Sequence, residues 1–410
     1  MQKIVTVVHW FNLLAALFLT ATMMFEFVDV PWGLLPHYLF FISYLVEFFL
    51  DRKWQTAKLD KTSIYFIGVL LFFLLAVMYY PFDSNTYFKV LLERRYALAG
   101  FAFVGFFGVN EKYKMSYFLN VFIATSLVVI FYLLFVRIGF LEFIQSDQKA
   151  LLFNRTRTAY VNQHMGFNLF LDLSLVGIWY FLKTSWRKLA IWKRSLYFVV
   201  ASFFLYFLLI SEGRAGFLIT IFLFCAIIAF ELWHKYPKLG LFIALFMVVA
   251  SIGFASQHQR IRNMRIEGDP RVFLWQSAWT VIKEKPLLGH GISTAQEHFN
   301  IERERNQTSS FEYEVKTMWP DVIIDSHNQV TQTWMEFGLL GVCFLMYLWL
   351  SPLLIVDKKR RLFTLLMLLL CVNQAMFNPF ITGSSSALFG VITLLLLRVP
   401  NNLSLSNKTD

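Results

Sequence analysis

The sequence predicts an all-α fold, a polytopic membrane bundle of about twelve transmembrane helices. Three observations support this prediction. Hydrophobic residues make up 58% of the 410-residue chain and charged residues only 15%, whereas an ordinary soluble domain carries about 25% charged residues. The apolar residues come in long blocks, as membrane spans require. Lysines and arginines gather in short loops between the blocks, which explains the net charge of +11 without a nucleic-acid partner.

Twelve apolar blocks follow one another along the chain, and each is predicted to be a span. The first begins after Lys3 and is too long for the apolar core of a cleaved signal peptide. An even number of spans places both termini on the same side of the membrane. The predicted spans are residues 4–24, 33–50, 63–80, 96–109, 116–139, 164–182, 195–210, 215–233, 239–255, 327–350, 362–377 and 384–398.

Basic loops alternate along the chain with loops of other composition, and this alternation orients the spans. All five basic loops fall on one side when the N-terminus lies in the cytoplasm, as the positive-inside rule requires. A missed span would break the alternation, so the number of spans and their orientation support each other. The basic residues are Arg52, Lys53, Lys58 and Lys61; Lys112 and Lys114; Lys183, Arg187, Lys188, Lys193 and Arg194; Lys235 and Lys238; and Lys358, Lys359, Arg360 and Arg361.

The longest loop lies on the opposite face, which is the periplasm in a Gram-negative cell, and its sequence predicts a folded helical cap. Asp269 fits a helix N-cap, and Pro270 fits the first helical position. An amphipathic helix at the membrane interface is predicted from Arg271 to Lys285, and a second, polar helix from Ser293 to Arg305. The residues that recur at helical spacing in the first helix are Trp275, Ala278, Trp279 and Ile282.

The chain is therefore divided into three parts. Residues 1–255 form the first nine spans with short loops, residues 256–326 form the cap, and residues 327–410 form the last three spans and a cytoplasmic tail.

Arginines on the periplasmic face are not explained by the positive-inside rule, which places basic residues in cytoplasmic loops, so they need another explanation. Arg214 lies in the shortest periplasmic loop, and Arg265 and Arg271 lie near the start of the first cap helix. A guanidinium group matches phosphate oxygens with two parallel hydrogen bonds, which favours a diphosphate ligand for this group. The alternative is contact with anionic lipid headgroups or pairing with nearby acids such as Glu267 and Asp269. Two further arginines on this face are Arg155 and Arg157.

His327 opens the tenth predicted span and is a candidate for proton transfer. At helical spacing His327 lies on one stripe of the helix with four later residues, two of which are glycines that allow close helix packing. The stripe is therefore predicted to face the bundle interior, with the imidazole in a cavity at the periplasmic mouth. A neutral imidazole accepts a proton near pH 7. Composition alone favours the alternative, an interfacial histidine that only hydrogen-bonds a neighbour. The stripe is Thr331, Trp334, Gly338 and Gly341.

The sixth predicted span begins in a similar way, at Asn162-Gln-His164. His164, Asn168 and Asp172 follow at intervals of four residues and form a polar stripe that enters the membrane. An ionisable residue at this depth suggests function; hydrogen bonding between helices is the alternative. Glu336 lies half a turn from the His327 stripe and is expected to have a structural partner.

Together these motifs resemble the O-antigen ligase family. His327-Asn328 followed by Gly338-Leu-Leu-Gly341, after a large outer loop, is similar to the histidine motif of that family. The matching segments share one face and cover about residues 160–345. The other segments that resemble the family are Asn162-Gln-His164, Ser211-Glu-Gly-Arg214, Arg271-x-x-x-Trp275 and Pro286-Leu-Leu-Gly-x-Gly291.

The resemblance implies a GT-C-type glycosyltransferase in the bacterial inner membrane, active at the periplasmic face. Its donor is a glycan on undecaprenyl diphosphate, and it uses no metal or other cofactor. A ligase transfers the glycan to lipid A-core, and a polymerase transfers it to another lipid-linked repeat. The long cap and the histidine motif favour the ligase.

The expected chemistry is inverting glycosyl transfer. His327 and Arg271 are the expected catalytic residues, and Arg214 and Arg265 join Arg271 in binding the diphosphate. The outer loops contain no Asp-x-Asp pair and no His/Asp cluster with metal-ligand spacing, so no metal is expected. The residues expected to support the site or line the acceptor groove are Asn328, Asn162, His164, Arg157 and Trp275.

Proteins of other classes share some of these features. A polysaccharide or lipid transporter would be polytopic and basic, but it should show an internal repeat and charges that reach both faces. The sequence shows no repeat, and its polar groups are one-sided. A channel needs a filter or pore-lining polar spans, and only the His164–Asp172 stripe suggests one. A nonenzymatic assembly scaffold is the remaining alternative.

Overall fold

The computed structural model is built of helices, and the residues it describes contain no strand. Every predicted span except 239–255 corresponds to a helix, and that span is described only in part. The described residues are 2–25, 33–78, 95–149, 152, 163–211, 214–233, 236–243, 245–246, 249, 270–305, 325–377 and 384–400.

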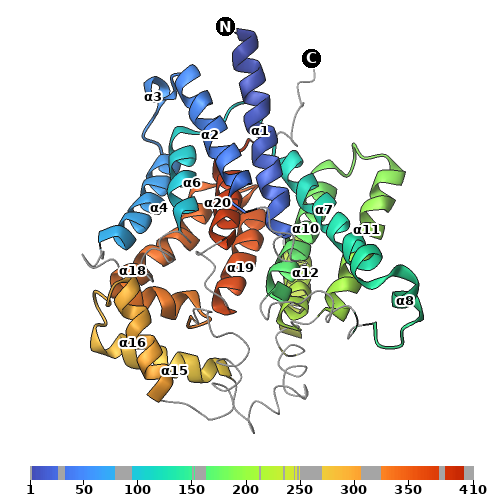
Figure 1. Ribbon diagram of the computed structural model, residues 1–410. Helices are drawn as coiled ribbons and strands as arrows, with labels where there is room; N and C mark the ends of the chain where they lie inside the picture. Colours follow the sequence, from blue (N-terminus) through green and yellow to red (C-terminus); the bar gives the residue numbers. More distant parts are fainter. Residues whose placement is uncertain are drawn as a thin grey trace.

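The helices follow the predicted order (Figure 1), and most begin within a few residues of the predicted positions. Two short helices and a π-helical turn were not predicted; the turn continues the fifth predicted span. The elements are α1 (Gln2–Phe25), α2 (Leu35–Leu50), α3 (Lys53–Thr56), α4 (Lys61–Met78), α6 (Tyr96–Phe107), α7 (Met115–Tyr132), η2 (Leu133–Ile138), α8 (Phe140–Gln145), α10 (Gln163–Ser185), α11 (Ile191–Ile210), α12 (Arg214–Trp233), α15 (Pro270–Glu284), α16 (Ile292–Arg305), α18 (Gln329–Ile355), α19 (Arg361–Phe377) and α20 (Ser384–Leu397).

The surface of the bundle is that of a membrane protein. Four helices of the described chain are long and apolar enough to cross a bilayer, and they contain Lys3–Phe25, Met115–Ile138, Ile191–Ile210 and Gln329–Ile355. Large apolar side chains point outward along several helices: Phe49 is 63% exposed and Leu354 is 75% exposed. Such extended apolar exposure is uncommon on soluble monomers. The total of twelve spans stays a prediction.

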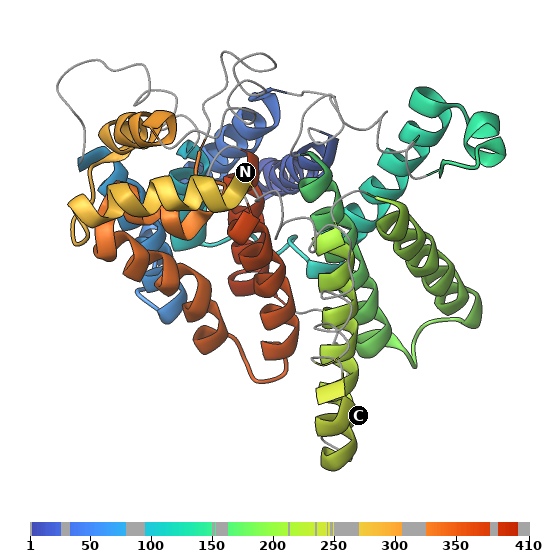
Figure 2. The same ribbon diagram turned by 90° about the horizontal axis from the view of Figure 1, so that it is seen from below.

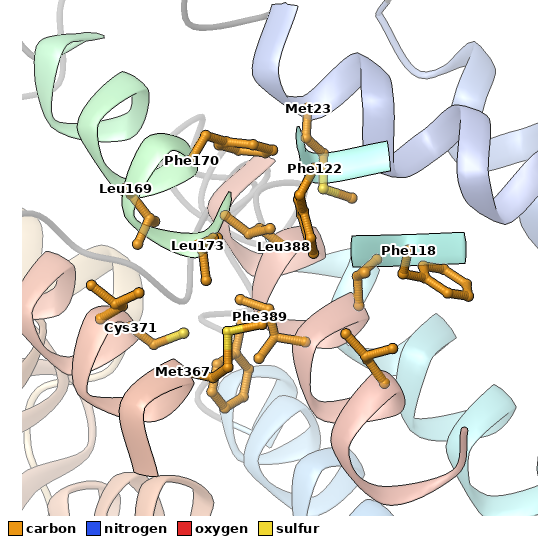
Figure 3. Packing of buried hydrophobic residues seen from close by; sticks show 14 of the residues in the cluster. Met23, Phe118, Phe122, Leu169, Phe170, Leu173, Met367, Cys371, Leu388 and Phe389 are labelled. Carbon is orange, nitrogen blue, oxygen red and sulfur yellow. The ribbon is translucent and has the colours of Figure 1, made fainter. Parts of the chain in front are cut away.

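The core lies where α1, α7, α10, α19 and α20 meet (Figure 3). Phenylalanine, leucine and methionine from all five helices are buried there, which orders the long apolar sequences around one centre. Apolar side chains fill this centre, and a hydrogen bond between the Ser126 and Ser174 hydroxyls at 2.9 Å also joins α7 to α10. The labelled residues of this core are Met23, Phe118, Phe122, Leu169, Phe170, Leu173, Met367, Cys371, Leu388 and Phe389.

The basic loops do lie together at one end of the bundle. The Lys53 ammonium donates to the Gly108 carbonyl at 2.9 Å, which joins the first loop to the second. Lys183 pairs with Glu231, which joins the third loop to the fourth. The Tyr180 and Phe363 rings have centroids 4.2 Å apart and connect this pair to the fifth loop. The end of α20 joins both groups of loops, because Arg398 donates to Asp60 at 2.9 Å and Arg360 donates to the Leu395 carbonyl at 3.1 Å. This agreement supports the predicted alternation of the loops.

The helices α15 and α16, here called the cap helices, lie at the other end of the molecule from the start of α1 (Figure 1). Viewed from that end, α15 lies across the bundle (Figure 2). We refer to this end as the cap end.

A buried ion pair joins α18 to the start of α6. The Arg95 guanidinium donates to both carboxylate oxygens of Glu336, at 2.9 and 2.7 Å, and both side chains are almost fully buried. The Gln332 amide donates to the same carboxylate at 2.9 Å. The expectation that Glu336 has a structural partner is therefore confirmed.

We expect the Glu336→Leu variant to be less stable than the native protein by about 3–5 kcal/mol, because it leaves the Arg95 charge buried without its carboxylate. The double variant with Arg95→Met should recover most of that loss, because apolar residues replace both partners. Thermal unfolding of the purified variants in detergent measures both effects. A single variant as stable as the native protein would show that the pair is dispensable.

Candidate functional site

The start of α18 is fixed by Asn328. Its side-chain oxygen accepts hydrogen bonds from the backbone N–H groups of Val330 (2.8 Å) and Thr331 (3.1 Å), which is an N-cap. Its amide nitrogen donates to the carbonyl of Met376 at 3.2 Å, at the end of α19. Asn328, predicted as a supporting residue, therefore positions the helix start next to α19.

His327 precedes this N-cap and adopts a left-handed backbone conformation, with φ of 49°. It is therefore not on the helix, and the predicted stripe that it shares with Thr331, Trp334 and Gly338 is wrong. Histidine adopts this conformation more readily than most residues, at some cost in energy. The Asp325 carboxylate holds the turn, because it accepts the backbone N–H of His327 at 2.8 Å.

The same carboxylate oxygen lies 3.2 Å from Nδ1 of His327, although not in line for a hydrogen bond. Among the described residues, Nδ1 has no hydrogen-bond partner, and a small rotation of the Asp325 carboxylate would let it accept the Nδ1 proton, which would leave the Nε2 lone pair to accept a proton. The side chain is 25% exposed, so substrate and solvent have access to it. The arrangement suits a general base.

Asp325 is a site residue that sequence reasoning missed. The signal was present, because an aspartate two residues before the histidine in a loop is typical of an Asx turn.

The first turns of α10, α12 and α18 lie at the cap end. The Ser211 hydroxyl, just before α12, donates to Asn168 near the start of α10 at 2.7 Å. The Tyr180–Phe363 contact pairs the end of α10 with the start of α19, so these helices run in opposite directions. Asn328, the N-cap residue of α18, contacts the end of α19, so α18 begins where α19 ends. Three helix N-termini, each with partial positive charge, therefore gather around one end.

The predicted polar stripe on α10 packs against α12. Asn168 and Asp172 are both buried, and Asp172 accepts a hydrogen bond from the Thr220 hydroxyl. These contacts favour the alternative interpretation, hydrogen bonding between helices.

Several predicted site residues are not described fully. Arg157, Asn162 and Arg265 lie outside the described residues. His164, Arg214 and Arg271 lie in the first turns of α10, α12 and α15, but only their backbones are described. In Figures 1 and 2, α15 has its first turn toward the middle of the bundle. The ligand contacts proposed for these side chains stay predictions.

The cap helices match the predicted positions, and the buried face of α15 shares Ala278 and Ile282 with the predicted apolar stripe. Trp279 is 46% exposed and lies edge-on to Trp334, with ring centroids 5.6 Å apart. Trp275, predicted to line the acceptor groove, is only half-buried. The buried face is shifted by about one residue, and it consists of Leu274, Ala278, Val281 and Ile282, packed against Ala295, Phe299 and Met335.

Two glycine motifs meet in what we call the glycine junction, residues 286–291 against residues 334–340. Gly338 has φ of 63° and interrupts α18. The carbonyls freed there accept the N–H groups of the turn: His290 donates to Met335 at 2.9 Å and Gly291 donates to Glu336 at 2.8 Å. The Leu339 N–H donates in return to the Pro286 carbonyl at 2.9 Å. Gly338 therefore forms a kink in α18 against which the turn of residues 286–291 packs, whereas a surface for close helix packing was expected.

Three side chains of types that can bind metals lie close together beside this junction, although their spacing in the sequence shows no metal-ligand pattern. They are Glu284, His290 and His298. Burial lowers the pKa of His290 below its usual value, so its ring is neutral at neutral pH.

In a comparison with known protein families, residues 197–346 match the O-Antigen ligase family. This match confirms the family resemblance drawn from the motifs. It spans Arg214, the cap helices and His327, and it leaves out the Asn162–His164 segment. No curated protein and no solved structure matches the chain.

We expect Gly338→Ala to release the cap helices from α18, because the new methyl group would overlap the Leu287 carbonyl and the backbone conformation there disfavours side chains. Limited proteolysis of the purified protein should show faster cleavage around residues 286–291. A suitable control is Gly177→Ala, whose added carbon would meet only Leu119 at 3.5 Å. Equal cleavage of the two variants would contradict this role of the junction.

Proposed function

We propose that the chain is an O-antigen ligase that transfers a glycan from undecaprenyl diphosphate to lipid A-core at the periplasmic face of the bacterial inner membrane. The family match and the membrane-type helices support a membrane protein that acts on lipid-linked glycans. The observation that carries the proposal is His327, which lies beside Asp325 at the end of the bundle where three helices begin.

In this proposal an acceptor sugar hydroxyl binds next to His327 in a GT-C-like bundle. Nε2 accepts the hydroxyl proton while the hydroxyl oxygen attacks the anomeric carbon of the donor. The bond from that carbon to the phosphate oxygen breaks, and undecaprenyl diphosphate leaves with the electron pair. Attack from the side opposite the leaving group inverts the anomeric centre.

The leaving diphosphate needs neutralisation of its charge more than it needs a proton. Arg214, Arg265 and Arg271 are proposed to supply that charge. Helix N-termini at the cap end add partial positive charge, which favours an anion in the same place. The chemistry requires no metal ion. Trp275, with Asn162, His164 and Arg157, is proposed to line the acceptor groove.

We expect His327→Ala to slow glycan transfer by about 10²–10⁴-fold, because the acceptor loses its general base. Asp325→Asn should also slow transfer, since the amide no longer favours the Nδ1 tautomer. Transfer by the purified protein between a lipid-linked glycan and lipid A-core measures both rates. Native rates in both variants, at normal expression, would remove this pair from the mechanism.

We expect Arg271→Ala to reduce the rate of glycan transfer by about 10²–10³-fold, which is the usual loss when an enzyme lacks one donor to the negative charge of its transition state. Arg305→Ala is the matched control, because Arg305 is an exposed cap arginine that pairs with Glu302. Surface polysaccharide from complemented cells, separated on a gel, shows the difference. Full-length laddering with Arg271→Ala would contradict a role in binding the diphosphate.

Deletion of the gene separates ligase from polymerase. Loss of a ligase leaves long chains on the lipid carrier, and loss of a polymerase leaves single repeats on the core. The ligase proposal predicts the first outcome.

A further inference from the structure

The residues just before α18 are held by a buried glutamine in its first turn. The backbone N–H of Ser326 donates to Oε1 of Gln332 at 3.3 Å. Nε2 of the same amide donates to Oε1 of Glu336 at 2.9 Å. Ser326, Gln332 and Glu336 are each at most 2% exposed. A chain of hydrogen bonds therefore runs through the protein interior, from the Arg95–Glu336 pair to the peptide that joins Asp325 to Ser326.

The neighbours of Gln332 allow only one orientation of its amide. The Glu336 carboxylate is paired with Arg95 and offers acceptors alone, so it requires the amide nitrogen. The Ser326 N–H is a donor, so it requires the amide oxygen. Glutamine satisfies both partners at once, whereas an apolar side chain of the same length satisfies neither.

The turn that carries His327 needs such support because its backbone is strained. The φ of 49° at His327 lies in the left-handed region, which a residue other than glycine keeps only when surrounding contacts impose it. Two of these contacts lie within the turn: Asp325 accepts the His327 N–H at 2.8 Å, and the Ser326 hydroxyl donates to the Asn328 carbonyl at 3.0 Å. The Gln332 amide adds the contact that connects the turn to the buried ion pair.

We propose that Gln332 is a positioning residue for glycan transfer. It fixes the plane of the peptide between Asp325 and Ser326, and it thereby holds the Asp325 carboxylate next to the His327 ring. Gln332 itself is 2% exposed and acts through these two side chains. The inference rests on the proposed function, in which His327 is the general base.

The first test measures transfer of a lipid-linked glycan to lipid A-core by purified Gln332→Met. Methionine has an unbranched side chain like that of glutamine but has no amide. We expect kcat to fall by up to about 100-fold with little change in KM, because a displaced base slows the reaction without removing a contact to substrate. Gln332→Leu removes the same amide with a different shape and should give the same result.

A double-mutant cycle with His327→Ala separates positioning from general stabilisation. If Gln332 acts through the imidazole, Gln332→Met should cause no further loss of rate once residue 327 is alanine. A residue that only stabilises the fold would lower the rate equally in both backgrounds. The control for stability is Ser126→Ala, which removes a buried hydrogen bond between α7 and α10 and should transfer at the native rate.

Amide hydrogen exchange gives a second measurement that does not depend on activity. Peptides that cover residues 325–331 should exchange faster in Gln332→Met than in the native protein or in Ser126→Ala, because the Ser326 N–H has lost its acceptor.

The outcomes distinguish this inference from the proposed function. A native transfer rate in His327→Ala would contradict the proposed base and, with it, the positioning role. If His327→Ala is slow, the base stands. In that case a native transfer rate or native exchange in Gln332→Met, or an equal loss of rate in both backgrounds, overturns the positioning role alone.

Discussion

The glycine junction is the constraint on which the cap end depends. A helix interrupted at Gly338 exposes backbone carbonyls in the middle of α18, and the N–H groups of residues 290 and 291 satisfy them. Side chains at positions 289 and 338 would overlap the opposing backbone, so the contact requires glycine on both sides. Because the junction lies only a few turns from His327, it fixes the cap helices relative to the candidate base.

The Arg95–Glu336 pair supports the junction from inside the bundle. Glu336 contributes its backbone carbonyl to the turn and its carboxylate to Arg95. One residue therefore connects α6, α18 and the cap. A buried charge pair is costly to desolvate, and removal of one partner is strongly destabilising because it leaves the other charge buried.

Composition and periodicity predicted the helices and the common end of the basic loops, and they placed the start of α18 at His327, two residues before its observed start at Gln329. The features that they could not predict depend on partners distant in sequence or on backbone conformation. Arg95 and Glu336 are 241 residues apart, and no local pattern connects them. The left-handed conformation of His327 removed it from the predicted stripe. The apolar stripe predicted on α15 coincides with its buried face only at Ala278 and Ile282, because that face is set by residues of other helices, which the local pattern does not show.

The central claim is that the diphosphate of a lipid-linked glycan binds at the cap end within reach of His327. An electron cryomicroscopy map of the protein in a lipid nanodisc, with undecaprenyl-diphosphate glycan bound, tests this most directly. Density for the diphosphate near the first turns of α10, α12 and α15, with the first sugar facing Nε2 of His327, is the predicted result. A diphosphate at the end with the basic loops, or one separated from His327 by packed helices, would contradict the account.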